Sequence, residues 1–212
     1  MNILLILAGD PPSENLLKTQ IELADVTIAV DGGTEVFVKF NLSPDLILGD
    51  LDSVRGEFYQ DTQVIEQSDQ DYTDLQKALK YILNQYSVNS LVLLGGTGGR
   101  TDHLLHNLHI CADIDFSVKV TFLSEKSVDG QNVMEIIQRI TPSIYFDSRV
   151  KVGTIISVLP VTHYEGLTSK GLEWELTSKN SNDQSISQSN QARITDPEFN
   201  LFTGCVYIAV YQ

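Results

Sequence analysis

Short apolar runs, separated by turn residues and amphipathic stretches, fill the chain up to about Lys126. Continuous runs of Ile, Leu and Val are typical of strands that are covered on both faces of a parallel sheet. This pattern predicts strands at residues 3–8, 26–30, 46–48, 63–66, 91–94 and 118–123. Strands that alternate with helices form a doubly wound, mostly parallel sheet, so this part of the chain is predicted to be α/β.

Amphipathic stretches between these runs predict the helices. Ser13 can cap the first helix, residues 34–40 form a short one, and Asp102 can cap the last. The strongest helix signal follows Thr73, because Thr73 and Gln76 match a capping box. The apolar residues of that helix fall on one face, namely Leu75, Ala78, Leu79, Ile82, Leu83 and Tyr86.

The pattern changes after Lys126, where short apolar runs are separated by turn residues. These runs are residues 133–140, 150–152, 154–159 and 205–211. They predict a smaller all-β sandwich domain, which gives predicted domains at residues 1–130 and 131–212. Residues 177–193 are rich in Ser, Asn and Gln and are predicted to form a polar, mobile loop.

Acidic or glycine-rich segments follow five successive predicted strands. They are Asp10, Asp31, Asp50, Asp69 and the loop Gly95–Arg100. In open α/β sheets, ligands bind beyond the carboxyl ends of the strands. We therefore expect these segments to form one site.

A divalent cation is the predicted occupant of this acidic edge. Asp50 and Asp52 point the same way if that segment is extended, and Asp71 and Asp74 flank Thr73. Two carboxylates about 4 Å apart repel by roughly 4 kcal/mol at an effective dielectric constant near 20, and oxygen ligands suit Mg²⁺, Mn²⁺ or Ca²⁺. The alternative for Asp71 and Asp74 is stabilisation of the helix dipole, and the alternative for Asp31 is a tight turn.

The glycine-rich loop Gly95–Arg100 is predicted to bind phosphate. It is neither a P-loop nor a dinucleotide fingerprint, because no Lys-Ser/Thr follows it and Thr101 stands where a glycine would be needed. Its glycines still permit close approach of the backbone to a phosphate at a helix start, where Arg100 offers a bidentate donor. His103 could touch the same ligand, and the alternative for the whole loop is a flexible turn.

Net charge and composition exclude several partners. The 212 residues carry a formal net charge of −14, which argues against nucleic acid and anionic membranes. Cys111 and Cys205 lie in apolar runs and are expected to pack as small hydrophobic residues. The opening apolar run is too short for a signal peptide, so a cytoplasmic location is predicted. The single Trp174 is either a core or interface residue or a stacking surface for a flat aromatic ligand, which could be cationic.

Taken together, these motifs resemble the thiamine pyrophosphokinase family. The resemblance is carried, in family order, by residues 31–33, 49–53, 69–74 and 95–103, and it continues into 171–174 and 189–190. It implies a Mg²⁺-dependent homodimer with sites at the subunit interface, which transfers pyrophosphate from ATP to the hydroxyl of thiamine. Gln191 departs from the family pattern, because an acidic residue often stands there.

The resemblance also implies a role for each matching residue. It implies metal ligands Asp50, Asp52 and Asp74, and nucleotide or phosphate contacts at Asp31, Gly32, Thr73, Gly98, Gly99, Arg100, Asp102 and His103. It places Trp174, Ser189 and Asn190 at thiamine, while Asp71 and Arg100 are the candidate catalytic residues. Two alternative functions remain open: a metal-dependent nucleotide-sugar transferase, and a nucleotide-sensing domain that binds ATP without consuming it.

Overall fold

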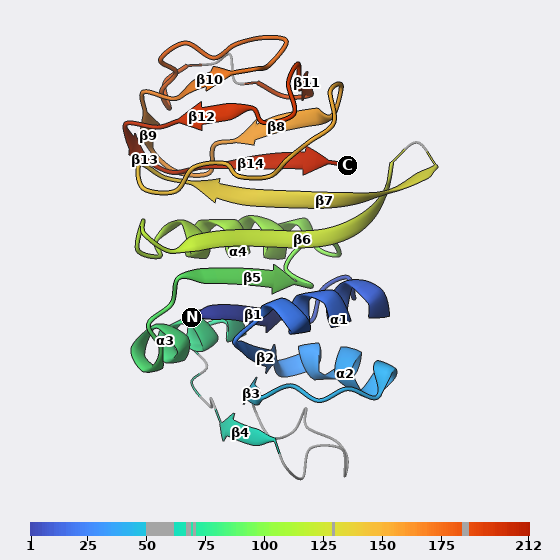
Figure 1. The fold of residues 1–212 in the computed structure, drawn as a ribbon. Coiled ribbons are helices and arrows are strands. Elements are labelled where there is room, and N and C mark those ends of the chain that lie inside the picture. Colours follow the sequence, from blue (N-terminus) through green and yellow to red (C-terminus); the bar gives the residue numbers. More distant parts are fainter. Residues whose placement is uncertain (50–61, 67–68, 70, 129, 184–186) are drawn as a thin grey trace. The chain divides into compact units, whose positions relative to one another are not determined.

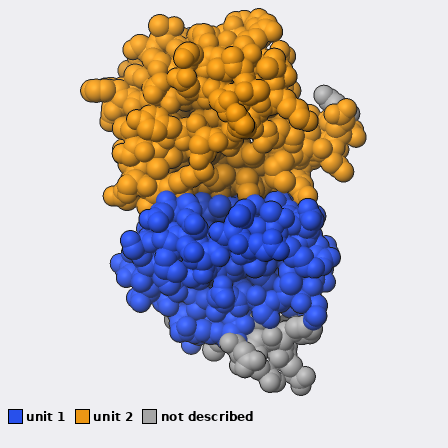
Figure 2. Space-filling view, viewed as in Figure 1, with its two compact units in different colours: residues 1–107 blue, residues 108–212 orange. Residues whose placement is uncertain are grey.

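The computed structural model describes residues 1–212 except 50–61, 67–68, 70, 129 and 184–186. The chain divides into two compact units, residues 1–107 and 108–212, which Figure 2 shows in different colours. The predicted functional domains, 1–130 and 131–212, remain predictions. Across the part of the chain that the structure describes, no helix is long and apolar enough to cross a membrane.

The first unit contains a parallel sheet in the order β5-β1-β2-β3-β4 (Figure 1). Its strands are β1 Asn2–Ile6, β2 Val26–Val30, β3 Leu46–Gly49, β4 Gln63–Glu66 and β5 Ser90–Leu94. Strands β1, β2 and β3 are almost wholly buried, as their continuous apolar runs predict. The predicted α/β fold class is confirmed.

Helices follow the strands of this unit. They are α1 Glu14–Leu23, the 3₁₀ turn η1 Asp31–Gly33, α2 Thr34–Phe40, α3 Asp74–Gln85 and α4 Thr101–Ala112, which begins in this unit and ends in the second. Ser13 caps α1, and its hydroxyl accepts a hydrogen bond from Leu16 N at 3.2 Å. The predicted apolar face of α3 is buried at Leu75, Ala78, Leu79 and Ile82, whereas Leu83 is exposed.

The second unit contains an antiparallel sheet in the order β11-β8-β14-β7-β6 and two small sheets, β10-β12 and β13-β9. Its strands are β6 Lys119–Val128, β7 Gln131–Ile140, β8 Ile155–Leu159, β9 Tyr164–Glu165, β10 Thr168–Lys170, β11 Asn190–Gln191, β12 Glu198–Asn200, β13 Thr203–Gly204 and β14 Val206–Tyr211. Residues from all three sheets share one core, in which the Phe146 and Phe199 rings meet edge to face. This two-layer packing agrees with the predicted sandwich.

The strand predicted at 118–123 is present as the first part of the long β6, which continues into an antiparallel hairpin with β7. Two details of the prediction are wrong. Residues 150–152 form no strand, because Thr154 N bonds Lys151 O in a turn that contains Gly153 at φ +89°. The last helix begins at Thr101, so Asp102 lies inside its first turn and does not cap it.

Hydrogen bonds fix much of the polar stretch 177–193. Lys179 and Leu167 exchange two backbone hydrogen bonds, and Asn190 pairs with Ile156 across β11 and β8. Ser181 N also donates to Tyr164 O. The described part of this predicted mobile loop is therefore attached to the strands of the second unit.

A buried arginine in β7 was missed by the sequence analysis. Arg139 has no exposed surface, and its guanidinium donates to the carbonyl oxygens of Cys111, Ile114, Asp115 and Val118 at 2.7–2.8 Å. These carbonyls lie at and just beyond the end of α4, where helical partners run out. Arg139 thus takes the place of water at that helix end. Cys111 and Cys205 are buried free thiols, as predicted.

Candidate functional site

Three loops meet at the carboxyl edge of the parallel sheet, backbone against backbone. Gly9 N donates to Gly95 O at 2.9 Å, which joins the loop after β1 to the loop after β5. A methyl group on Gly95 would lie 2.2 Å from Leu7 O, and one on Gly33 would lie 2.2 Å from Ile6 O. Only glycine permits such approaches. The contacts between these loops are therefore made at glycines.

The glycine-rich loop lies on the chain segment that carries Asp10. Gly95, Gly98 and Gly99 have φ values of +67°, +84° and +62°, which favour glycine. A methyl group on Gly98 would lie 1.8 Å from Asp10 Oδ2. The loop leads directly into α4, whose first backbone N–H groups can bind an anion.

Arg100 and Asp102 form a bidentate ion pair at the start of α4. Arg100 Nε donates to Asp102 Oδ1 at 3.1 Å, and Nη2 donates to Oδ2 at 2.5 Å. The hydrogen bonds from Arg100 hold the pKa of Asp102 below its ordinary value. Both side chains are exposed, so the predicted phosphate donor is available at the surface. His103 is exposed beside them, and its phosphate contact remains a prediction.

Asp31 begins the turn between β2 and α2. It is a non-glycine residue with a φ of +46°, and Thr34 Oγ1 donates to its carbonyl oxygen at 2.9 Å. A methyl group on Gly49 would lie 3.2 Å from Asp31 Cα, so the end of β3 packs against this turn. The predicted tight turn is present, and a nucleotide contact at Asp31 or Gly32 remains a prediction.

The predicted metal ligands are only partly described. Asp50 and Asp52 lie outside the residues that the structure describes. Asp74 lies in the first turn of α3, half-exposed, with its Oδ1 2.7 Å from Lys77 Nζ. Within the described ranges, no group of three or more His, Cys, Asp or Glu side chains could hold a metal ion. The arrangement of Asp50, Asp52 and Asp74 therefore remains a prediction.

The segment before α3 is fixed by local hydrogen bonds. Thr73 and Gln76 form the predicted capping box: Gln76 N donates to Thr73 Oγ1 at 3.4 Å, and Thr73 N donates to Gln76 Oε1 at 3.0 Å. Asp71 N donates to Asp69 Oδ1 at 3.0 Å. This segment holds Asp71 and Asp74 on either side of the helix start, which leaves the proposed roles of both carboxylates open.

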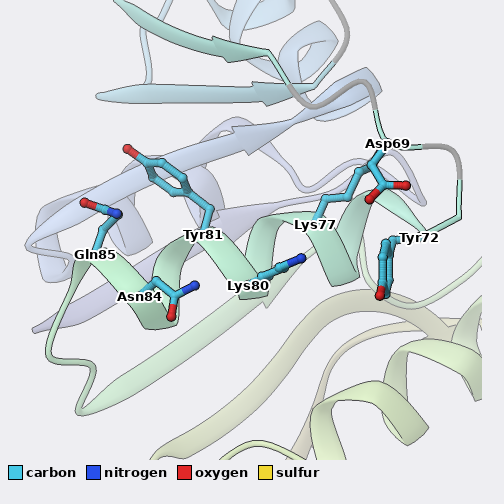
Figure 3. Close-up of a pocket in the computed structure, with 7 residues that line it drawn as sticks. All are labelled: Asp69, Tyr72, Lys77, Lys80, Tyr81, Asn84 and Gln85. Carbon is cyan, nitrogen blue, oxygen red and sulfur yellow. The ribbon is translucent and has the colours of Figure 1, made fainter.

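A pocket on α3 was not predicted. It has a volume of about 200 Å³ and is lined by Asp69, Tyr72, Lys77, Lys80, Tyr81, Asn84 and Gln85 (Figure 3). Lys80 Nζ lies 5.2 Å from the centroid of the Tyr72 ring, a cation–π distance. The sequence feature that could have indicated this pocket is the helical spacing of the polar residues on α3, opposite its apolar face.

In the second unit, the three predicted thiamine residues lie together. Asn190 is buried, and its Nδ2 donates to Trp174 O at 2.7 Å while its Oδ1 accepts from Trp174 N at 3.2 Å. Ser189 precedes it with a φ of +55°, and Ser189 N donates to Ser157 Oγ at 2.9 Å. Trp174 is 61% exposed. Trp174 is therefore not a core residue, and its interface and stacking interpretations remain.

Two family models cover most of the chain. The model described as "Thiamin pyrophosphokinase, catalytic domain" matches residues 17–122, and that described as "Thiamin pyrophosphokinase, vitamin B1 binding domain" matches residues 141–206. The chain belongs to the thiamin pyrophosphokinase family. The family resemblance predicted from the motifs is confirmed, and so is the prediction that the protein is an enzyme.

Individual thiamin pyrophosphokinases support this membership. The chain is 28% identical to thiamin pyrophosphokinase 1 of Caenorhabditis elegans over 80% of this chain and 72% of that protein. It is 31% identical to thiamine pyrophosphokinase 2 of Arabidopsis thaliana over 66% of this chain and 55% of that protein.

Solved structures of thiamin pyrophosphokinases have the same fold. The crystal structure from Bacillus subtilis matches with a TM-score of 0.75 at 21% identity, covering 99% of this chain and 98% of that one. The structure from Candida albicans matches with a TM-score of 0.76 at 17% identity, covering 99% and 88%.

Proposed function

We propose that this thiamin pyrophosphokinase transfers a pyrophosphoryl group from ATP to the hydroxyl of thiamine, giving thiamine diphosphate and AMP. The main support is the glycine junction at the carboxyl edge of the parallel sheet. There the backbone of Gly95–Gly99 leads into α4, and at Gly9, Gly33 and Gly95 the backbone contacts are too close for a side chain to fit. A polyphosphate can approach such a backbone closely.

The phosphate groups of ATP are proposed to bind the loop N–H groups at Gly98 and Gly99 and the guanidinium of Arg100. Arg100 already holds one carboxylate in a bidentate pair with Asp102, which is the geometry that a phosphate also requires. In the proposed complex, Arg100 stabilises the charge that develops on the transferred group. Asp31, Gly32, Thr73 and His103 complete the proposed nucleotide contacts.

Magnesium is the proposed cofactor, with Asp50, Asp52 and Asp74 as its ligands. The described member of this set fits a cation, because the Asp74 carboxylate is half-exposed and already pairs with the ammonium group of Lys77. Carboxylate oxygens are the ligands that Mg²⁺ prefers. When bound, Mg²⁺ supplies charge neutralisation to the phosphates.

Asp71 is the proposed acceptor for the proton of the thiamine hydroxyl. Its backbone is held by Asp69, and its exposed position before α3 gives a substrate access to the carboxylate. Thiamine is proposed to bind at Trp174, whose exposed face suits a cationic ring, together with Ser189 and Asn190. We further propose a cytoplasmic homodimer with its sites at the subunit interface.

The deciding experiment is incubation of the purified protein with ATP, Mg²⁺ and thiamine. We expect AMP and thiamine diphosphate to form in equal amounts. Consumption of a UDP- or GDP-sugar without AMP would instead identify a nucleotide-sugar transferase. Binding of ATP without its consumption would identify a nucleotide-sensing domain, and either result would overturn the proposal.

A binding experiment tests the thiamine side separately. The chain has one tryptophan, so its fluorescence reports on Trp174 alone. We expect thiamine to quench this fluorescence in a saturable way, whereas ATP alone should leave it nearly unchanged. Quenching that does not saturate would contradict a thiamine site at Trp174.

A further inference from the structure

The glycine-rich loop contains a buried hydroxyl group without a partner. Thr97 is only 2% exposed, and its Oγ1 forms no hydrogen bond with any residue in the described ranges. It stands in the middle of the loop, between Gly96 and Gly98. The other two such buried side-chain atoms in the described ranges, on Arg139 and Tyr164, belong to the second unit.

The loop is held in place on both sides of Thr97. Asn107 Nδ2 donates to Gly96 O at 2.9 Å. Gly98 lies against the Asp10 carboxylate, and Thr97 O lies 3.2 Å from the position of a methyl group on Gly9. Because these contacts fix the backbone on both sides of Thr97, the hydroxyl can change its direction only by rotation about the Cα–Cβ bond.

A buried hydroxyl group without a hydrogen bond is unfavourable, and native proteins contain few of them. Valine has nearly the same shape as threonine without the hydroxyl group, so it would remove this cost. A threonine at such a position is therefore expected where the hydroxyl is satisfied by a bound ligand. The ligand proposed for this loop is a polyphosphate, whose oxygens accept hydrogen bonds strongly.

We propose that the Thr97 hydroxyl is a phosphate-binding donor of the glycine-rich loop, which contacts the polyphosphate of the nucleotide. This inference rests on the proposed function, and it adds a side-chain donor to a loop whose other predicted contacts before Arg100 come from the backbone. The family resemblance implied no role for Thr97, and this inference gives its hydroxyl a binding role.

The test compares Thr97→Val with Thr97→Ser. Unfolding in urea gives the stability of each variant without ligand, and calorimetry with Mg²⁺ gives the affinity for ATP and for inorganic pyrophosphate. Thiamine is left out, so that no turnover occurs. We expect Thr97→Val to be at least as stable as wild type but to bind both probes about tenfold or more weakly. Thr97→Ser, which keeps the hydroxyl, should retain most of the affinity.

Several outcomes would overturn the inference. Thr97→Val could lose stability and keep its affinity, which would give the hydroxyl a structural role, or it could match wild type in both measurements. If Thr97→Val does not fold, the affinity difference between Thr97→Ser and Thr97→Ala isolates the hydroxyl, and equal affinities would contradict its role. Weaker pyrophosphate binding by Thr97→Val in a protein that makes no thiamine diphosphate would refute the proposed function and support the inference.

Discussion

The carboxylate of Asp10 lies directly against the α carbon of Gly98, so that a methyl group there would be 1.8 Å from Oδ2 and 2.9 Å from Cβ of Asp10. The loop after β1 thus determines how closely the glycine-rich loop can approach the sheet edge. Since the Cβ atom is also too close, a shift of the carboxylate alone would not make room for a larger residue.

Gly98→Ala should therefore destabilise the protein more than Gly99→Ala. Both glycines have positive φ values, so each substitution costs about 1 kcal/mol from backbone strain. Only Gly98 also meets Asp10, because nothing lies within 4 Å of a methyl group on Gly99. Urea unfolding measures the difference. In an Asp10→Gly background the two substitutions should cost the same, and a persistent difference would show that Asp10 is not the cause.

Removal of Arg100 should raise the pKa of Asp102. Hydrogen bonding by Arg100 lowers this pKa in the folded protein, so the pair contributes stability above the unfolded-state pKa of the carboxyl group and loses it as the pH falls through the lowered value. Carboxyl NMR titration of Arg100→Gln should show Asp102 returning toward its ordinary pKa. Asp196, which is paired with Arg149, is the control and should titrate unchanged.

Arg139→Met should be among the most destabilising substitutions in the second unit. It leaves at least four carbonyl oxygens at and beyond the end of α4 without their donor. We expect a loss of roughly 3–5 kcal/mol in the free energy of unfolding. Urea unfolding with far-UV circular dichroism measures it. Arg149→Met, at an exposed ion pair, should change the stability little. Similar losses in both variants would contradict the role given to Arg139.

Asn190→Ala should release the backbone of Trp174. The amide of Asn190 bonds both the N–H and the carbonyl of Trp174, so its loss leaves two backbone groups without partners. We expect a change in Trp174 fluorescence and weaker thiamine binding, with ATP affinity kept. Gln191→Ala removes an exposed neighbour and should have neither effect. An unchanged emission spectrum in Asn190→Ala would contradict this arrangement.

Local signals made part of the fold predictable. Strands β2 and β4 have the bounds that their apolar runs predict, and the capping box at Thr73 locates the start of α3. The β6-β7 hairpin was missed although the sequence Asp-Gly at 129–130 is typical of two-residue hairpin turns. The apolar runs of β6 and β7 look like those of any buried strand, so they do not show that the two strands pair.

Contacts between residues far apart in the chain could not be predicted from the sequence. Arg139 interacts with carbonyl groups, which every residue carries, so no sequence pattern marks its partners. In the candidate site, the order of motifs identified the loops that meet, but it could not reveal that Asp10 lies against Gly98. Nor could it reveal that the side-chain amide of Asn190 forms hydrogen bonds with the backbone of Trp174.

The close backbone contacts at Gly9, Gly33 and Gly95, where the three strand-end loops join, also constrain how this edge of the sheet can move. Side chains between segments act as adjustable spacers, but at these three glycines the backbone lies directly against neighbouring peptide groups. A displacement of one loop by a bound substrate must therefore carry the adjoining loops with it. We expect this edge to respond to its substrates as one stiff element.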